Sequence, residues 1–199
     1  MTGHTYDKEI TALLVIGPYN DFISKEGKIS DRIRAVAEAN NCVPHMLQVL
    51  TAARKAKLRV FYALHHRYRP GDYETWKYIA PIQKAAWMHK SFECGTWGGE
   101  IRPEFEPKPG EIVATEHWCS AASLTRIWIC SSRSTTSIGS SSSDSSRIPA
   151  SKRPFAMPLS SATTSRWVKD ATADYSDEAM HAALDINIPN YRQCRRDHK

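Results

Sequence analysis

Apolar residues along the chain occur in two patterns, short continuous runs and a helical repeat. The run over residues 10–16 ends at a Gly-Pro turn, which is typical of a buried strand. From residue 43 the apolar positions recur at i, i+3, i+4 and i+7, so residues 43–57 are predicted to form an amphipathic helix. Residues 58–64 follow as a second strand. This order predicts a parallel β-α-β unit and therefore an α/β fold.

The rest of the chain is less regular. Residues 65–110 are rich in Tyr, Trp, His and Gly, which is typical either of an excursion over the mouth of a pocket or of an aromatic-rich surface loop. Residues 111–118 are predicted to form a third strand, residues 167–176 a strand that leads into a loop, and residues 177–186 a helix with acidic residues in its first turn. Residues 121–166 show neither the strand pattern nor the helix pattern.

The composition is that of one globular domain. The chain has 199 residues, of which 41% are hydrophobic and 24% charged, so a single domain over residues 1–199 is expected. No apolar run approaches the length of a membrane span and the N-terminus is polar, so we expect a cytoplasmic protein with no membrane partner. The five cysteines include no C-x-x-C pair, which argues against a disulfide framework and a zinc site. Neither a metal nor a cofactor is expected.

The formal net charge of +6 is confined to two segments. Residues 121–166 carry six Lys or Arg and one Asp, and residues 192–199 carry four Lys or Arg and one Asp. The remainder has 17 basic and 19 acidic residues, a charge of −2. Neither segment has the arginine-serine repeats or interleaved aromatic residues of an RNA-binding segment, so no nucleic-acid partner is expected.

Several long motifs share one resemblance. They are "TALLVIGPYNDFIS", "RVFYALHHRYRPGDYETWKYIAPIQKAAW", "FECGTWGGEIRPEF", "EHWCS" and "VKDATADYSDEAMHAALDINIPNY". Over residues 11–120 and 167–191 the chain resembles the isochorismatase-like cysteine hydrolases. The resemblance implies a Rossmann-like three-layer α/β/α sandwich with a parallel sheet, and a small substrate such as an amide, a ureide or a vinyl ether. Members of this family often assemble, so a homo-oligomer is one expectation.

The resemblance also implies a catalytic set and a substrate pocket. The amide hydrolases of the family use a Cys nucleophile with an Asp and a Lys, because a thiolate is the reactive form of cysteine and needs groups that manage its proton. Gly17 stands where the family's Asp ends the first strand. Asp21 is present, with either a structural role in the turn or a role as a substitute base. The candidate substrate-binding residues are Tyr19, His65, His66 and Trp97.

The other two members of the catalytic set are also missing. The nearest candidates for the position of the Lys are Glu116 and His117, and His117 is either a proton carrier or a structural histidine. Nothing in residues 121–166 fits the motif of the nucleophilic Cys, and Cys119, which lies near the site in sequence, is the only thiol that could stand in. No catalytic set is intact, so the chain is predicted to be inactive as written.

The Ser-rich run at residues 131–148 contains ten serines in eighteen positions. Serine codons of the TCN type begin with T, and in a frame that starts one base earlier this T becomes the middle base, which always specifies an apolar residue. Read in that frame, residues 140–146 give "LIVIGLI", a buried strand. The codons that follow give "AHTCIEATVRYAAELGY", a helix that begins with the missing cysteine, whose codon straddles Pro149 and Ala150. We therefore interpret residues 121–166 as an out-of-frame segment.

The same operation applies to the C-terminus. One base removed after Tyr191 turns the basic residues 192–199 into part of "YANAVVTT", a plausible last strand. In the chain as given, the central strand and the helix after it are therefore predicted to be disrupted. Residues 121–166 are predicted to be disordered, without a stable strand or helix. Two functions stand: a cysteine hydrolase by descent that is inactive as written, or a non-catalytic small-molecule or protein binding module with a flexible Ser-rich tether.

Overall fold

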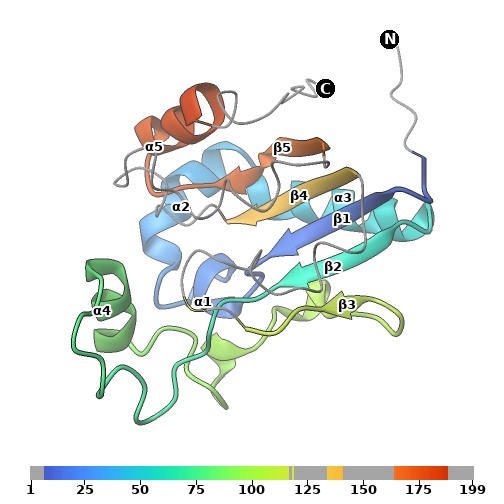
Figure 1. Cartoon of the computed structure of the whole chain (residues 1–199). Helices are drawn as coiled ribbons and strands as arrows, with labels where there is room; N and C mark the ends of the chain where they lie inside the picture. Colours follow the sequence, from blue (N-terminus) through green and yellow to red (C-terminus); the bar gives the residue numbers. More distant parts are fainter. Residues whose placement is uncertain (1–6, 117, 119–133, 141–163, 188–199) are drawn as a thin grey trace.

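The chain folds around a five-stranded parallel sheet (Figure 1). The computed structural model describes residues 7–116, 118, 134–140 and 164–187. The strand order is β3-β2-β1-β4-β5, which confirms the predicted α/β class with a parallel sheet. The strands are β1 (Thr11–Ile16), β2 (Arg59–Ala63), β3 (Ile112–Val113), β4 (Ser134–Ser140) and β5 (Thr164–Ala173).

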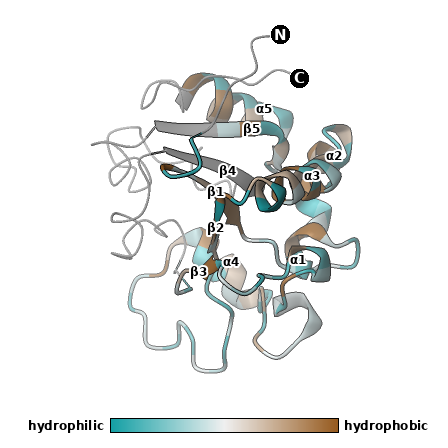
Figure 2. Cartoon of the chain, turned by 90° about the vertical axis from the view of Figure 1, so that its right-hand side faces the viewer, coloured by the Kyte–Doolittle hydropathy of each residue, from teal (hydrophilic) through white to brown (hydrophobic). Residues whose placement is uncertain are grey.

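Two long helices cover one face of this sheet, as Figure 2 shows. They are α2 (Ser30–Ala39) and α3 (Cys42–Lys55). The shorter helices among the described residues are α1 (Asn20–Ile23), α4 (Pro81–Met88), and α5 (Asp177–His181) with its π-helical continuation Ala182–Asn187. The same residues include two 3-10 turns, η1 (Trp97–Gly99) and η2 (Pro103–Phe105). Residues 141–163, where the helix after the central strand is predicted to be disrupted, lie outside the described residues.

The predicted β-α-β unit is confirmed. Strand β1 pairs in parallel with β2, with Val15 opposite Tyr62, and α3 connects them. The predicted third strand is shorter than expected, because pairing is limited to Ile112 and Val113 opposite the end of β2. One further backbone hydrogen bond, from the N–H of Ala114 to the carbonyl of Tyr62, continues this contact.

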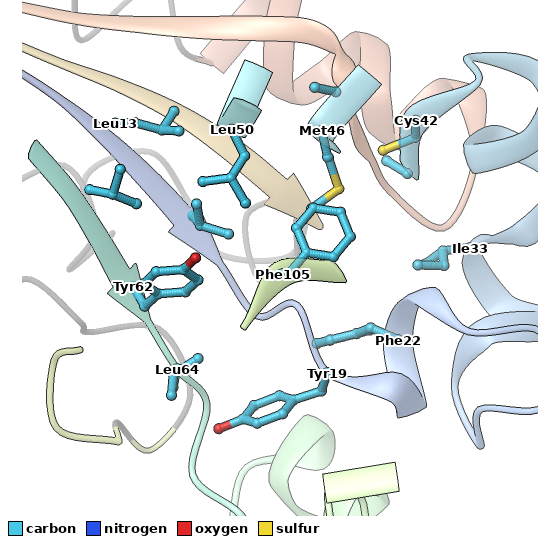
Figure 3. Close-up of a cluster of buried hydrophobic side chains, with 14 of the residues drawn as sticks. Leu13, Tyr19, Phe22, Ile33, Cys42, Met46, Leu50, Tyr62, Leu64 and Phe105 are labelled. Carbon is cyan, nitrogen blue, oxygen red and sulfur yellow. The ribbon is translucent and has the colours of Figure 1, made fainter. Parts of the chain in front are cut away.

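The continuous apolar run of β1 is explained by burial on both faces of the sheet. Leu13 and Val15 pack into the main core with Met46 and Leu50 of α3 (Figure 3). The alternate residues of β1 belong to a second cluster, made by Ala12, Leu14, Phe61 and Ala63. Since successive side chains of a strand point to opposite faces, a strand buried on both sides reads as uninterrupted apolar sequence.

The structure corrects one expectation about residues 121–166. Residues 134–140 form β4, which pairs with β1 and β5, and β5 begins at Thr164. Pairing of this kind satisfies backbone N–H and C=O groups on the edge of β1 and does not require apolar side chains. The strand lies beside β1 and shares only Ser140 with the run 140–146. The remainder of the segment lies outside the described residues.

Candidate active site

The carboxyl ends of β1 and β2 meet at Gly17 and His65. The N–H of Gly17 donates to the carbonyl of Ala63 at 3.0 Å, which holds the two strand ends together. Gly17 has φ of +57°, and a Cβ added to it would lie 3.0 Å from Cδ2 of His65. A side chain at position 17 would therefore face both backbone strain and a close contact, so the local backbone fits glycine and not the aspartate of the family motif.

Tyr19 is buried and contacts the end of β2 at His65. Its hydroxyl donates to the carbonyl of His65 at 2.9 Å, and its ring packs on Phe92 with centroids 4.9 Å apart. Burial, and then the negative charge of Glu116, raise the pKa of Tyr19 above its usual value. The side chain is 1% exposed. In this structure the phenol is therefore a neutral donor that fixes the end of β2.

Asp21 is fully enclosed by backbone. Its two carboxylate oxygens accept hydrogen bonds from the N–H of Lys28 at 3.1 Å and of Phe92 at 2.8 Å. Gly98 packs against the same carboxylate, where a Cβ would clash. These contacts match the structural alternative for Asp21, since both oxygens hold loops together and neither faces open space.

Trp97 is connected to the site through its backbone. Asn20, next to Asp21, donates from Nδ2 to the carbonyl of Trp97 at 2.9 Å. The indole ring itself is 51% exposed. Of the four candidate substrate-binding residues, Tyr19, His65 and His66 thus lie together at the strand ends, while the Trp97 side chain lies on the surface.

Glu116, at the position expected for the Lys, forms an ion pair with Arg67. Nε of Arg67 lies 2.6 Å from Oε1, and the backbone N–H of Arg67 donates to Oε2 at 3.1 Å. Burial alone would raise the pKa of Glu116, but these hydrogen bonds and the charge of Arg67 outweigh it and hold the pKa below its usual value. The same hydrogen bond raises the pKa of Arg67. The chain after β3 therefore carries a firmly ionised carboxylate near the position for which the family resemblance implies a Lys.

His66 lies between two carboxylates. Its Nε2 is 2.9 Å from Oδ2 of Asp72, and its Nδ1 is 3.6 Å from Oε2 of Glu116. The ring stacks on Trp118 with centroids 3.6 Å apart. Trp118 also contacts Tyr73 and Trp76, at centroid distances of 5.1 and 5.0 Å. We call His66, Tyr73, Trp76 and Trp118 the aromatic cluster.

Several members of this site were not predicted, among them Arg67, Asp72 and Trp118. The richness of residues 65–110 in Tyr, Trp and His is a signal for the aromatic residues of that segment, and Trp118 lies outside it. Their partners are far apart in sequence, as Arg67 and Glu116 are separated by 49 positions, and spacing alone does not encode such a pair. His117 and Cys119 lie outside the described residues.

The described residues supply no assembled catalytic set. The cysteines among them are Cys42, which is buried, and Cys94, which is exposed, and both are free. Within the same part of the chain, no group of three or more His, Cys, Asp or Glu side chains is placed to hold a metal ion. Nor does any described helix combine the length and the hydropathy needed to cross a membrane.

Comparisons with known proteins agree with this architecture. The cysteine hydrolase from Pseudomonas syringae pv. phaseolicola 1448A aligns with a TM-score of 0.67 and 13% identity, over 96% of this chain and 90% of that chain. An isochorismatase family protein from Desulfovibrio vulgaris aligns with a TM-score of 0.65 and 14% identity, over 94% of both chains. The N-carbamoylsarcosine amidase from Thermoplasma acidophilum gives a TM-score of 0.60 and 19% identity, over 96% of this chain and 98% of that chain.

At sequence identities of 13–19%, the similarity to these solved structures shows a shared fold. A search of curated proteins finds no match. The family model of the isochorismatase domain matches residues 11–136, more than half of the chain. With the parallel sheet and the strand-end site arranged as described, the chain belongs to the isochorismatase family.

Proposed function

We propose that this protein descends from hydrolases of small amides or ureides and is catalytically inactive as written. The observation that carries the proposal is the charge arrangement at the strand ends. Gly17 leaves β1 without a carboxylate, while Glu116 places one at the end of β3, paired with Arg67 at 2.6 Å. A thiol nucleophile needs a base near it and a site that stabilises developing negative charge. A carboxylate held ionised beside an arginine is a poor proton acceptor.

The second part of the proposal is that residues 121–166 and 192–199 are read out of frame. The family match ends at residue 136, inside the first of these segments. Six of the seven residues of β4 are Ser, Thr or Gly, although a strand between two parallel neighbours is normally apolar. Both observations support a lost nucleophile strand. Sequencing the gene across codons 119–168 and 190–199 tests this, and an intact open frame without insertions or deletions would refute it.

Activity is tested with nicotinamide and N-carbamoylsarcosine as substrates, because structural neighbours named for these chemistries share the fold. The expected result is ammonia release at the rate of the buffer control. The variant Cys119→Ser is the matched control, since Cys119 is the thiol proposed as the one that could stand in for the missing nucleophile. Ammonia release above background that disappears in Cys119→Ser would overturn the assignment of inactivity.

A binding module is the second candidate, and the aromatic cluster favours it. Trp118 stacks on His66 at 3.6 Å and stays 38% exposed, so a planar surface is available without any nucleophile. Calorimetric titration with nicotinamide separates the two candidates. If nicotinamide binds without turnover and Trp118→Ala abolishes this binding, the result supports a binding module with a Ser-rich tether. If nicotinamide does not bind, the result supports the inactive hydrolase.

A cytoplasmic location and a homo-oligomer belong to the same proposal. The family resemblance supports the second. Cell fractionation and light scattering coupled to size-exclusion chromatography test them.

A further inference from the structure

The helix α4 differs from the other α-helices of the described chain because none of its residues is buried. It follows the end of β2 and lies at the margin of the molecule, as Figure 1 shows. A helix of a soluble domain normally buries one face against its own core. A helix whose residues all stay at least partly accessible is therefore a candidate for contact with another surface.

One ring contact shows which side of α4 faces the protein. Trp87 packs on Tyr73 with ring centroids 6.3 Å apart, so this side of the helix lies against the chain that follows β2. The exposed residues of the helix are Pro81, Lys84 and Met88. They share the other face, because residues three and four positions apart on a helix are neighbours. Met88 is 72% exposed, so this face presents a large apolar side chain to solvent.

Tyr78, just before the helix, is a second large side chain without cover. It is 83% exposed, and Nζ of Lys77 lies 5.5 Å from the centre of its ring. Trp76, by contrast, packs in the aromatic cluster, with its ring 5.3 Å from that of Tyr73. The start of the segment is thus held in the cluster, while Tyr78 and Met88 extend to solvent.

The same segment is basic. Its three charged side chains between residues 75 and 92 are Lys77, Lys84 and Lys90. All three are exposed, and the ion pairs among the described residues include none of them. With Glu74 counted, residues 74–92 carry three lysines and one glutamate, a net charge of +2. Glu93, which follows, lies 3.5 Å from Lys28, and this ion pair offsets its charge.

Lysines interleaved with exposed aromatic and apolar side chains are typical of a segment that lies on an anionic membrane. An apolar side chain there enters the acyl boundary, a tyrosine ring lies among the headgroups, and lysines meet the lipid phosphates. A second copy of the chain fits less well, since a two-fold contact through this segment would bring its lysines together. Single-stranded nucleic acid binds on a series of stacking rings, whereas this face combines Tyr78 with Met88, which has no ring.

We propose that the α4 surface docks the protein on an anionic membrane. This surface consists of Lys77, Tyr78, Lys84, Met88 and Lys90. The expectation of no membrane partner rested on the absence of a spanning run, and a peripheral contact of this kind does not require one. None of the five residues belongs to the strand ends, so the inference is independent of the proposed loss of catalysis.

The first test is co-sedimentation of the full chain with phosphatidylcholine vesicles, with and without about 30% phosphatidylglycerol. The chain should bind the anionic vesicles at least about tenfold more tightly, because each lysine near an anionic surface adds to the affinity. Salt at about 1 M, which shortens the Debye length to about 3 Å, should remove this preference. Equal binding to both kinds of vesicle, or no binding to the anionic kind, overturns the proposal.

Charge reversal locates the contact. Lys84→Glu should weaken binding to anionic vesicles at least about fivefold, since one lysine near such a surface contributes about that factor. Lys55→Glu is the matched control, because Lys55 is an exposed helical lysine that precedes the start of β2, whereas α4 follows its end. Met88→Ser should weaken binding by a similar factor through the loss of apolar contact. Equal effects of Lys84→Glu and Lys55→Glu overturn the site.

A second readout separates docking from adsorption of a loosely packed chain. Acetylation of lysines is followed by peptide mass spectrometry, with and without anionic vesicles. When most of the chain is bound, acetylation of Lys84 should slow at least about fivefold, and that of Lys55 should not change. Equal protection of the two lysines refutes a defined docking face. Binding to polyglutamate and not to vesicles, lost in Lys84→Glu, would assign the surface to an acidic protein and also refute the proposal.

Discussion

At the scale of single residues, the charge at the strand ends depends on Gly17 and Glu116. The sequence pointed to both positions, through the family motif in the first case and through its place on the third predicted strand in the second. It did not predict that Glu116 binds Arg67, because that contact requires the ends of β2 and β3 to be neighbours. The sequence shows only an acidic residue at position 116, whereas the structure shows that this residue forms an ion pair with Arg67.

Restoring the family's aspartate at position 17 should fail. In Gly17→Asp the residue must adopt φ near +57° and its Cβ meets His65, so we expect the free energy of unfolding to fall by about 1–2 kcal/mol or more. No amide hydrolysis should appear. The control is Gly71→Asp, which also has positive φ but no atom within 4 Å of the added Cβ. Urea-induced unfolding measures both variants, and a Gly17→Asp protein as stable as the original contradicts this account of the junction.

Glu116→Gln should lower stability and change its pH dependence. Loss of a hydrogen-bonded charge should reduce the free energy of unfolding by about 1.5–3 kcal/mol at pH 7. Because the folded-state pKa of Glu116 is depressed, its stabilisation is complete above the usual value of 4.5 and disappears as the pH falls through the folded pKa. The original and variant chains should therefore converge in stability at acid pH.

Unfolding midpoints in urea between pH 7 and pH 3 measure this convergence. Glu111, whose pKa is also lowered, affects both chains equally, so the difference between them isolates Glu116. Glu38→Gln, at an exposed position of α2, is the control and should leave the profile unchanged. A constant difference between the original chain and Glu116→Gln at every pH argues against the ion pair.

At the scale of elements, periodicity predicted β1, α3, β2 and β5 because their apolar faces are buried against one another. It predicted too long a third strand, because "EIVATEHW" is strand-like along its whole length while β3 pairs at two residues. It also did not identify α4, whose eight residues include none that is buried. Helices without a buried face leave little periodic signal.

Asp21 joins three elements that are distant in sequence. It lies in α1 and accepts from the backbone before α2 and from the backbone after α4. Asp21→Asn replaces one acceptor oxygen by a donor that faces a backbone N–H. We expect a loss of about 1–3 kcal/mol in the free energy of unfolding.

Asp31→Asn is the matched control for this change, because Asp31 is an exposed aspartate whose side chain is 78% accessible. Surface substitutions of this kind usually change stability by about 0.5 kcal/mol or less. Urea unfolding followed by tryptophan fluorescence measures both variants. Equal effects of the two substitutions would show that the bonds of Asp21 do not hold these elements together.

At the scale of the whole molecule, the central strand governs stability. If "LIVIGLI" is the intended strand, the written chain lacks about six apolar side chains, each contributing about 1.5–3 kcal/mol on burial. This amounts to about 10 kcal/mol or more, which is comparable to the net stability of a domain, about 5–15 kcal/mol. We expect the written chain to be poorly packed in solution and a frame-corrected chain to unfold cooperatively.

Hydrogen exchange and thermal unfolding of the two chains check this expectation. The chain as given should show weak amide protection across residues 141–160 and a broad transition, and the frame-corrected chain should show strong protection and a sharp transition. A sharp transition together with strong protection in the written chain would count decisively against the frameshift proposal.

The sequence by itself determined the α/β class, the first β-α-β unit and the family, because apolar periodicity and long motifs are local properties of the chain. The tertiary structure decided the ion pair of Glu116 with Arg67 and the stacking of Trp118 on His66. Each of these joins residues that strand order and helix packing bring together, and a linear pattern does not specify such distances. It also decided that residues 134–140 pair beside β1, because backbone hydrogen bonds form without regard to side-chain hydropathy.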